Sequence, residues 1–582
     1  MNIRLPRPSP SRGTDPRQEY PGLIPLARRD YVAAAGLAGG ILLLYSLTRL
    51  HVHNQCVDCT SYAGTIQRAD PQHLVQGAHL IYLWLVSSIL VAFRQAAPDL
   101  TPFVAAQVFN SIAASLAIAV FYLLARRIRM GRLLAVSLSL VLAFSYTFWS
   151  LSNDVEVHAP AVFFLLLSLL IVTLPWARAS SWRSVLFGAV SALAILFHAF
   201  SSLSVPVITA LLLASQEGQA NASGVPFAVR AKRAVVYVAT ATIGVVVPYI
   251  AVLTQVLGLH SVQEVTWWVF SFLNDPGLAE RAGLPVFATI VLTGTGLVRA
   301  LLGVISWIAA PGLGDYLRQA FAQRCIVEET YLTRSLSPAL ATAASSASVM
   351  AGGLFAVFCV RGVTGLVAAR KRLPRITIAL ILWLVLYAVL LMIAAPASSE
   401  HWAFYWLPPF LLAIGCGLSE AHDLTRRTRS GLNSLMGALV TVLFAANLVN
   451  ILLQGDPEND LYLHRLSWYQ ANTSAKDLVI SSGGYKWDSY LEYYLSTRIE
   501  MLDRRFRTMP VSAFIRLAQD EIRAVRSDGG RVFVMQDVLE PEMCQARYGG
   551  WDLAAISMFR QAILPRLECF SSEDVRICEV TS

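Results

Sequence analysis

The sequence carries very little charge for its length. Only 14% of its 582 residues are Asp, Glu, Lys or Arg, whereas 55% are hydrophobic and the mean hydropathy is +0.55. An ordinary soluble domain does not tolerate such a composition on its surface, so the chain is predicted to be a polytopic α-helical membrane protein. Its net charge of +9 comes from arginine clusters in short loops. These clusters indicate membrane topology and give no reason to expect a nucleic-acid partner.

Several motifs that would point to particular chemistry are missing. No G-x-G-x-x-G or GKS sequence accompanies the glycine pair Gly483-Gly484, so a plain turn is favoured there over a phosphate-binding loop. The run His51–Cys59 has ligand types for zinc but lacks a second C-x-x-C, which favours a local disulfide or free thiols over a metal site. No internal repeat is evident, which argues against a transporter built from two related halves.

Apolar stretches of a length that crosses a bilayer recur along the chain, and about eleven are predicted to span it. They are Tyr31–Leu50, Ala105–Ala125, Leu133–Ser150, Ala159–Trp176, Ser184–Ala199, Ser201–Ser215, Ala234–Leu257, Thr342–Val363, Ile376–Ala395, Trp406–Glu420 and Gly431–Leu453. Two further apolar runs, Leu80–Phe93 and Val286–Ala310, are expected to lie along the outer surface or to re-enter the membrane. Arg299, in the middle of the second run, favours this interpretation.

Arginines set the expected orientation. Residues 1–30 carry six arginines and no small-residue cleavage site, which predicts a cytoplasmic tail and an uncleaved first span. With that start, five basic loops fall on the cytoplasmic side. They are Arg126–Arg129, Arg178–Arg183, Arg230–Arg233, Arg370–Arg375 and Arg426–Arg429. The loops 51–104 and 258–341 and the whole of residues 454–582 then lie outside. Paired Trp267 and Trp268 in the second loop are interpreted as part of an interfacial aromatic belt.

Residues 454–582 have ordinary globular composition and are predicted to form a small extracytoplasmic α/β domain. Strands are expected at Asp477–Ser481 and Arg531–Met535, and Phe514 to Val525 between them keep helical spacing. Six cysteines are expected outside and two inside spans. The outer ones are Cys56, Cys59, Cys325, Cys544, Cys569 and Cys578, and the inner ones are Cys359 and Cys416. A bridge between Cys569 and Cys578, or between Cys544 and Cys569, would fit an oxidising exterior.

The turn Asn153–Pro160 is the most informative feature of the membrane region. It places Asp154, Glu156 and His158 directly between two apolar runs, at the expected membrane surface. Ionisable groups at this depth are costly and commonly mark a site, although a solvated turn would also explain them. By contrast, His198, between two short spans, is interpreted as a packed or backbone-bonded histidine.

Several segments together resemble a known family. They are Cys56–Tyr62, His79–Trp84, Asn110–Ala117 leading to Tyr122–Arg127, Ala143–Ser150 leading to Glu156–His158, and Glu400–Pro409. In this order they resemble the GT-C superfamily of membrane glycosyltransferases. The likeness is greatest to the protein O-mannosyltransferase-like group of bacterial members, whose third span ends in a similar FWS…EVY pattern.

The resemblance implies a function and a set of site residues. It implies transfer of a hexose or pentose, in a mannosyltransferase-like reaction, from a polyprenyl-phosphate-linked donor to a protein, lipid or polysaccharide acceptor on the outer face of a bacterial inner membrane. Asp58 maps to the catalytic base and Glu156 to a second catalytic acid, near which a divalent metal could sit beside the donor phosphate. The residues expected to bind substrate are Asp154, His158, His79, Glu400 and His401.

The chain departs from the family pattern at three places. Asp58 is bracketed by cysteines with no adjoining acid, His158 replaces a tyrosine, and Glu400-His401 stands where Arg-Tyr is common. A transporter or lipid flippase is the main alternative function, and a membrane scaffold that presents the C-terminal domain is a third. The transferase interpretation requires the carboxyl groups of Asp58 and Glu156 to face one cavity within roughly 10 Å.

Overall fold

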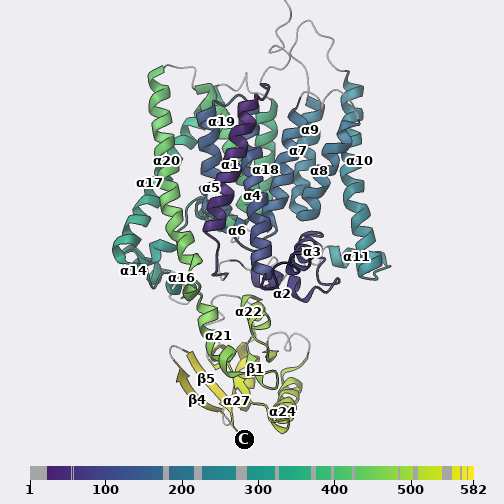
Figure 1. Cartoon of the computed structure of the whole chain (residues 1–582), viewed down its shortest axis with the longest axis vertical. Coiled ribbons are helices and arrows are strands. Elements are labelled where there is room, and N and C mark those ends of the chain that lie inside the picture. The colour runs from purple at the N-terminus through teal and green to yellow at the C-terminus, as the bar shows by residue number, and fades with distance from the viewer. Residues whose placement is uncertain are drawn as a thin grey trace, which may run out of the picture.

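Helices that run side by side form most of the chain, and a smaller α/β domain lies at one end of them (Figure 1). This computed structural model describes residues 23–53, 56, 58–174, 182–214, 226–269, 285–320, 327–368, 375–394, 399–421, 426–482, 485–502, 509–539, 553–563, 567–572 and 575–581. We refer to the end of the helical bundle that meets the α/β domain as the domain end.

The first half of the bundle contains α1 to α11. These helices are α1 (Arg28–Leu47), α2 (Cys59–Arg68), α3 (Tyr82–Arg94), α4 (Pro102–Arg127), α5 (Arg132–Phe144), α6 (Tyr146–Ser152), α7 (His158–Thr173), α8 (Arg183–Phe197), η3 (Ala199–Leu203), α9 (Ser204–Ala214), α10 (Phe227–Ala251), the π-helical η4 (Val252–Val256) and α11 (Val262–Val269). The second half contains α13 (Val286–Leu301), η6 (Ile305–Ala309), α14 (Leu313–Ala320), α16 (Val327–Leu332), α17 (Pro338–Ala368), α18 (Arg375–Ala394), α19 (Ser399–Ala421) and α20 (Arg426–Gly455).

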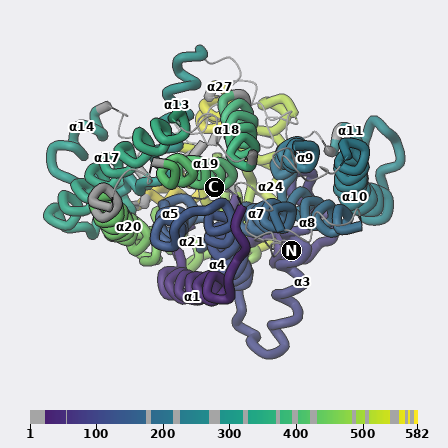
Figure 2. The backbone as a smooth tube through the Cα atoms, turned by 90° about the horizontal axis from the view of Figure 1, so that it is seen from above, coloured from purple at the N-terminus to yellow at the C-terminus, as the bar shows by residue number. Residues whose placement is uncertain are grey.

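Viewed along the bundle, the helices form two flanks and a centre (Figure 2). Helices α17 and α20 lie on one flank and α8 and α10 on the other, while α4, α5, α7 and α19 lie between them. Helix α4 begins sharply because Thr101 accepts a hydrogen bond from the amide of Val104 and Pro102 occupies the first turn. Its small side chains let neighbouring helices approach, and most of its residues are buried. The centre of the bundle is therefore built around α4.

The predicted spans coincide with helices in the structure. Each of the eleven predicted segments corresponds to one helix or to two consecutive helices. Within the described residues, five helices are long and apolar enough to cross a membrane, namely α1, α4, α10 with η4, α17 and α20, and the bent pair α5–α6 would be a sixth. Others, such as α7, α8 and α18, are shorter apolar helices. The chain is thus a multi-pass membrane protein, while the count of eleven spans stays a prediction.

One predicted span is broken. The segment Leu133–Ser150 forms α5 and α6, which meet at a 61° bend. Ser145 at the bend has an extended backbone (φ −62°, ψ 138°), and its hydroxyl donates to the carbonyl of Leu142. The break turns α6 away from the axis of α5, so that the acidic turn after α6 is carried into the protein.

The two apolar runs expected at the surface take different positions. Helix α3 lies at the domain end beside α2 (Figure 1). Helix α13 instead packs against α19 and α6, after which the chain turns back through η6.

The C-terminal domain is a mixed five-stranded sheet with helices on both faces. It contains η8 (Pro457–Asn459), α21 (Leu461–Asn472), β1 (Leu478–Ser481), α22 (Tyr485–Tyr494), β2 (Arg498–Met501), α24 (Val511–Ser527), β3 (Val532–Val534), α25 (Gln536–Leu539), α27 (Leu553–Ile563), β4 (Leu567–Ser572) and β5 (Val575–Val580). The strand order is β2-β1-β3-β5-β4. Strand β1 pairs in parallel with β2 and β3, whereas β5 is antiparallel to β3 and β4.

Successive side chains of β1 point alternately into two hydrophobic cores, one on each face of the sheet. Leu478 and Ile480 of β1 pack with Phe514 and Ile522 of α24. Val479, between them in sequence, faces the opposite core with residues of α21 and α22. This period of two is what a strand covered on both faces requires. Both strands and the helix predicted from sequence are therefore present, although Gly483 and Gly484 lie outside the described residues.

Two disulfides that the sequence allowed are present, while the side of the membrane on which the cysteines lie stays a prediction. Cys56 bonds to Cys59, and Cys569 bonds to Cys578 across the paired strands β4 and β5. Cys325 and Cys544 lie outside the described residues.

Helix α22 joins the domain to the bundle. It packs against α2, and the ring of Tyr493 lies 5.1 Å from that of Phe103 at the start of α4. Arg68 of α2 lies 4.0 Å from Glu492 of α22. The C-terminal domain therefore packs against α2, the helix that begins directly after Asp58.

Candidate functional site

The acidic turn between α6 and α7 is held by a buried amide. Asn110 of α4 donates to the carbonyl oxygens of Asp154 and Glu156, both at 2.7 Å, and also lies 2.9 Å from the hydroxyl of Tyr82. One side chain thus satisfies two carbonyl groups of a buried turn, which would otherwise each cost about 1–3 kcal/mol. The turn is a fixed structure and not a solvated loop.

The beginning of the turn is fixed to α1. Asn153 donates to the carbonyl oxygen of Thr48 at 2.9 Å, and the indole of Trp149 donates to the hydroxyl of the same threonine at 2.9 Å. Ser111 donates to the carbonyl of Ser152 from the side of α4. These bonds set the direction in which the two acids of the turn leave the backbone.

Asp154 is paired with a histidine from the loop after α1. Nδ1 of His53 lies 2.7 Å from Oδ1 of Asp154, and both side chains are buried. The amide of Val155 also donates to Oδ1, at 2.9 Å. Both of these contacts involve Oδ1 of the carboxylate, so within the described part of the chain Oδ2 is the oxygen that can take another partner.

A disulfide anchors the segment that carries Asp58. Cys56 and Cys59 flank Asp58, and the amide of Cys59 contacts the sulfur of Cys56 at 3.1 Å. Asp58 immediately precedes α2, whose Tyr62 donates from its hydroxyl to Asp58 at 3.3 Å. Because α2 is buried on nearly all sides, these two links leave Asp58 little freedom to move.

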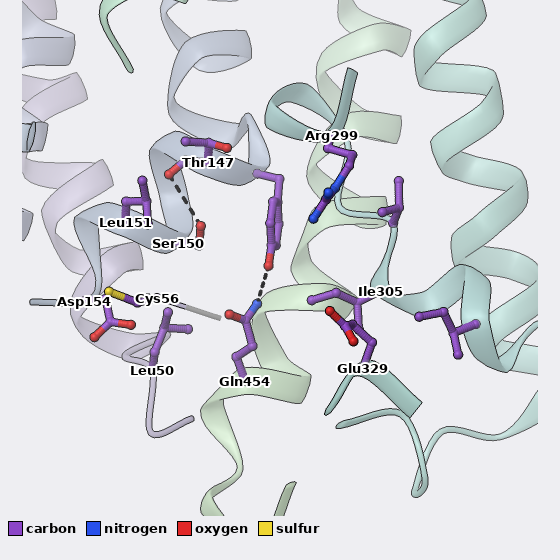
Figure 3. A pocket seen from close by; sticks show the side chains of 13 residues that line it. Leu50, Cys56, Thr147, Ser150, Leu151, Asp154, Arg299, Ile305, Glu329 and Gln454 are labelled. Carbon is purple, nitrogen blue, oxygen red and sulfur yellow. Dashed lines mark hydrogen bonds between the residues drawn. The ribbon is translucent and has the colours of Figure 1, made fainter. Parts of the chain in front are cut away.

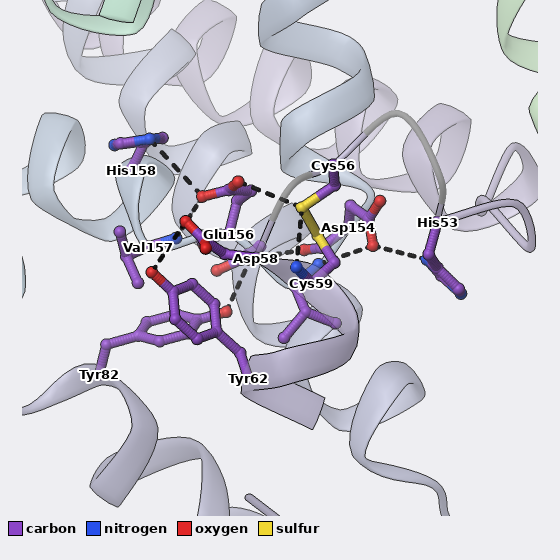
Figure 4. Close-up of a disulfide and its surroundings, with 12 residues drawn as sticks. His53, Cys56, Asp58, Cys59, Tyr62, Tyr82, Asp154, Glu156, Val157 and His158 are labelled. Carbon is purple, nitrogen blue, oxygen red and sulfur yellow. Dashed lines mark hydrogen bonds and ion pairs between the residues drawn. A yellow bond between two sulfur atoms is a disulfide. The ribbon is translucent and has the colours of Figure 1, made fainter. Parts of the chain in front are cut away.

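The carboxyl groups of Asp58 and Glu156 lie beside each other. Figure 4 shows them pointing toward one another, next to the Cys56–Cys59 disulfide. Asp58 comes from the first loop and Glu156 from the turn before α7, so their meeting depends on how α2 packs against the centre of the bundle. Asp58 is partly exposed, whereas Glu156 is buried. The two acids that the sequence predicted to be catalytic are therefore brought together.

The surroundings of Glu156 keep it neutral. Burial raises its pKa well above the usual value, and the negative charges of Asp58 and Asp154 raise the pKa further, whereas a hydrogen bond from the Val157 amide lowers it. Oε1 of Glu156 lies 3.2 Å from the sulfur of Cys56. Since a disulfide sulfur has no hydrogen to donate, a protonated Glu156 is the partner that suits this contact.

A row of three histidines, His158, His198 and His79, reaches Glu156 through His158. Nε2 of His158 lies 3.6 Å from Glu156, and the ring of His158 lies 5.0 Å from that of His198. His79 stacks 6.2 Å from His198, and among the described residues neither of its ring nitrogens has a hydrogen-bond partner. Burial lowers the pKa of His79 to about 4, so its ring is neutral. His198, predicted to be packed or backbone-bonded, accepts from the Phe200 amide at 3.2 Å.

The arrangement does not fit a zinc site. Among the described residues, Cys56, Cys59 and Glu156 are the one group whose ligand atoms lie within 4.8 Å of one another. The two sulfurs share a disulfide and are not thiolates, which zinc requires. A divalent metal held by carboxylates alone stays a prediction, and no step below depends on it.

Some predicted residues cannot be placed at the site, and others were missed. Glu400 and His401 begin α19, but their side chains lie outside the described residues, as does that of Trp267. Trp268 stacks edge-on against Tyr249, 6.3 Å away. The contributions of His53, Tyr62 and Asn110 were not predicted. The only sequence signal for His53 was its place in the run of possible ligands before Cys56.

A cavity adjoins the acidic turn (Figure 3). It is lined by Leu50, Cys56, Tyr146, Thr147, Ser150, Leu151, Asp154, Arg299, Val304, Ile305, Ile308, Glu329 and Gln454. Cys56 and Asp154 belong both to this lining and to the cluster around Glu156. Asp58 and Glu156 do not line this cavity, so it is not the shared cavity that the transferase interpretation requires, although it offers space for a ligand beside the acidic turn.

Comparisons with known proteins concern the fold. No protein-family model and no curated protein matches the sequence. Among solved structures, the chain is similar to ArnT from Cupriavidus metallidurans in the apo state, with a TM-score of 0.54 and 12% identity over 94% of this chain and 97% of that one. It is also similar to ArnT bound to undecaprenyl phosphate, with a TM-score of 0.49 and 12% identity over 95% and 98% of the two chains. The chain therefore has the GT-C membrane fold that the segments around Asp58 and Glu156 predicted.

Proposed function

We propose that this protein is a membrane glycosyltransferase that uses a polyprenyl-phosphate-linked sugar donor. The observation that carries the proposal is the pair of carboxyl groups of Asp58 and Glu156, one partly exposed and one buried, beside a cavity at the domain end of the bundle. The sequence resemblance and the GT-C fold support it.

The difference in burial between Asp58 and Glu156 gives the two acids different roles. Two carboxyl groups this close do not both ionise readily, and the one with the raised pKa retains its proton. Burial and the negative charges of Asp58 and Asp154 raise the pKa of Glu156, which favours Glu156 as the proton-bearing partner. Asp58 is also the more exposed of the two and is therefore the group that an acceptor can reach.

In the proposed reaction Asp58 acts as the general base. It takes the proton from the acceptor hydroxyl while that oxygen attacks the anomeric carbon of the sugar. The bond from this carbon to the phosphate oxygen breaks, and its electron pair leaves with the polyprenyl phosphate. General-base catalysis of this kind contributes roughly 10²- to 10⁴-fold to the rate. Glu156, with Tyr62, would hold Asp58 in position.

The more specific predictions from the sequence, on subgroup, sugar, location and lipid carrier, are part of this proposal. The O-mannosyltransferase-like grouping and the mannosyl specificity rest on the sequence resemblance and not on the likeness to ArnT. A bacterial inner-membrane location, an extracytoplasmic domain end, and substrate roles for Glu400 and His401 are likewise proposed. The lipid carrier is proposed to be a polyprenyl phosphate, and one ArnT structure holds undecaprenyl phosphate.

The test compares Asp58→Asn with wild type in proteoliposomes. Purified full-length protein receives polyprenyl-phosphate donors that carry different radiolabelled sugars, together with a membrane-lipid extract as acceptor. We expect transfer from at least one donor, and a loss of at least about a hundredfold in Asp58→Asn. Asp70→Asn is the matched control, because Asp70 lies in the same outer loop but is exposed and pairs with His73.

Two results would count against the proposal. Equal transfer by Asp58→Asn and wild type would remove Asp58 as the base. Movement of labelled undecaprenyl phosphate between leaflets by wild type, without transfer from any donor, would favour a flippase.

A further inference from the structure

The cavity beside the acidic turn collects polar groups from distant parts of the chain. It has a volume of about 70 Å³, several times the roughly 10–15 Å³ that one ordered water needs. Asp154 comes from the turn after α6, Arg299 from α13 and Glu329 from α16. Gln454 at the end of α20 donates to the hydroxyl of Tyr146 at 3.0 Å. Figure 3 shows these side chains around one space.

The lining mixes these polar groups with apolar ones. Leu50, Leu151 and Ile305 line the same cavity as Tyr146. Carboxylates, an amide and a guanidinium together offer both donors and acceptors, which suits vicinal hydroxyl groups. Apolar and aromatic side chains suit the C–H faces of a sugar ring. The lining therefore fits a ligand with many hydroxyl groups and some apolar surface.

The balance of charge argues against a phosphate as the group bound here. Asp154 and Glu329 supply two carboxylates against the single guanidinium of Arg299. His53, which hydrogen bonds to Asp154, would only balance these charges if it were protonated. Phosphate sites in proteins instead provide cationic side chains or clustered backbone amides in excess. The two carboxylates would repel a phosphate, whereas they would not repel a neutral or amine-bearing sugar.

The position of the cavity links it to the acids. Cys56 contributes to the lining and also contacts Glu156 at 3.2 Å. Asp154 presents Oδ1 to His53, and among the residues that the structure describes Oδ2 is the oxygen that can face a ligand. A sugar ring in the cavity would thus lie next to Cys56, which itself contacts Glu156 of the acidic pair.

We propose that this cavity binds a sugar ring through Asp154, Arg299, Glu329 and Gln454. The proposal rests on the proposed glycosyltransferase function, since it assigns the sugar of the donor or of a sugar acceptor to this place. Arg299 and Glu329 become binding residues that determine which sugar is accepted.

The first test measures binding, independently of turnover. The ligands are D-mannose, D-glucose, D-galactose and L-arabinose at millimolar concentration, and undecaprenyl phosphate alone, added to full-length protein in nanodiscs. Thermal shift measurements should show that Glu329→Gln and Arg299→Gln each bind the preferred sugar about tenfold or more weakly than wild type does. Each variant loses a charged hydrogen bond to the sugar. Binding of undecaprenyl phosphate should be unchanged. Asp315→Asn in α14 is the control, because its carboxylate is exposed and pairs with Arg318.

A second measurement needs no variant. In wild type, the preferred sugar should slow amide hydrogen exchange in residues 327–332 and 299–309, which border the cavity, and leave α24 unchanged. Absence of this protection, or sugar binding that is equal in Glu329→Gln and wild type, would overturn the proposal. A loss of undecaprenyl phosphate binding in Arg299→Gln would assign the cavity to phosphate and overturn it as well.

Kinetic measurements distinguish a donor sugar from an acceptor sugar, and they test the two proposals separately. A raised KM for the donor in Glu329→Gln assigns the donor sugar to the cavity, whereas a raised KM for a sugar acceptor assigns the acceptor. Asp58→Asn should still bind sugar while it loses transfer. Sugar protection without transfer in wild type would defeat the proposed function alone, and transfer without sugar protection would defeat this inference alone.

Discussion

His53 and Asp154 form a buried pair that joins the loop after α1 to the turn before α7. Nδ1 of the histidine and Oδ1 of the aspartate lie 2.7 Å apart, and the two side chains are only 5% and 4% exposed. The pair couples residues 101 positions apart in the chain. It holds the loop that leads to Cys56 and Asp58 against the acidic turn.

The first prediction concerns this pair. His53→Ala removes the hydrogen bond to the buried Asp154 and should lower the free energy of unfolding by about 1–3 kcal/mol, the usual cost of leaving a buried polar group without its partner. Denaturation by SDS in detergent micelles would measure it. His73→Ala removes the similar His73–Asp70 pair, whose side chains are 66% and 44% exposed, and should change stability little. Equal effects of the two substitutions would contradict the prediction.

The raised pKa of Glu156 predicts a dependence of stability on pH. The folded protein keeps a proton that the unfolded chain releases near pH 4.5, so folding is favoured most below that pH. Stability should then fall as the pH rises from about 4.5 toward the raised pKa. Thermal unfolding between pH 4.5 and 9 should show a smaller fall for Glu156→Gln, which cannot ionise. An unchanged slope in that variant would show that Glu156 does not hold the proton.

The disulfide predicts a sensitivity to reduction. Replacing Cys56 and Cys59 with serine frees the segment that carries Asp58, and a displacement of about 1 Å can cost a hundredfold in rate. We expect transfer to fall at least about tenfold in this double variant, and in wild type after treatment with dithiothreitol. The double serine variant at Cys569 and Cys578 changes a disulfide of the sheet and should retain transfer. Similar losses in the two variants would indicate a general effect on folding.

Close packing between α17 and α19 predicts a steric effect. A Cβ at Gly417 would lie 1.9 Å from the carbonyl oxygen of Gly362, so the helices would have to separate. Gly417→Ala should lower stability by at least about 1–3 kcal/mol, as overpacking does. Gly353→Ala in α17 meets nothing within 4 Å and should be neutral or slightly stabilising. Thermal unfolding of the two variants in detergent would distinguish them.

Much of the fold could be predicted from sequence because its signals are local. Long apolar runs located the helices, and short apolar runs located β1 and β3. The 61° bend at Ser145 could not be seen, because α5 and α6 together read as one apolar stretch. Strand β2 was also missed, since Arg498–Met501 is short and half charged.

The candidate site was predictable only in part. Asp58 and Glu156 were identified through a family resemblance, and the structure places them together. Their supporting partners were not identified, because the bond from His53 to Asp154 and those from Asn110 depend on packing between distant segments. The cavity escaped prediction for the same reason, since Arg299 and Glu329 approach Asp154 only in the folded chain.

The packing of α22 on α2 has a consequence for biosynthesis. Helix α2 ends at residue 68, whereas the helix that covers it ends at residue 494, where Tyr493 contacts Phe103. While the ribosome is still making the intervening residues, the segment that begins at Asp58 lacks this cover. The acidic pair is therefore completed late, after most of the chain has been synthesised and inserted. A truncated chain that stops at the end of α20 would contain both acids and still lack the helix that packs against α2.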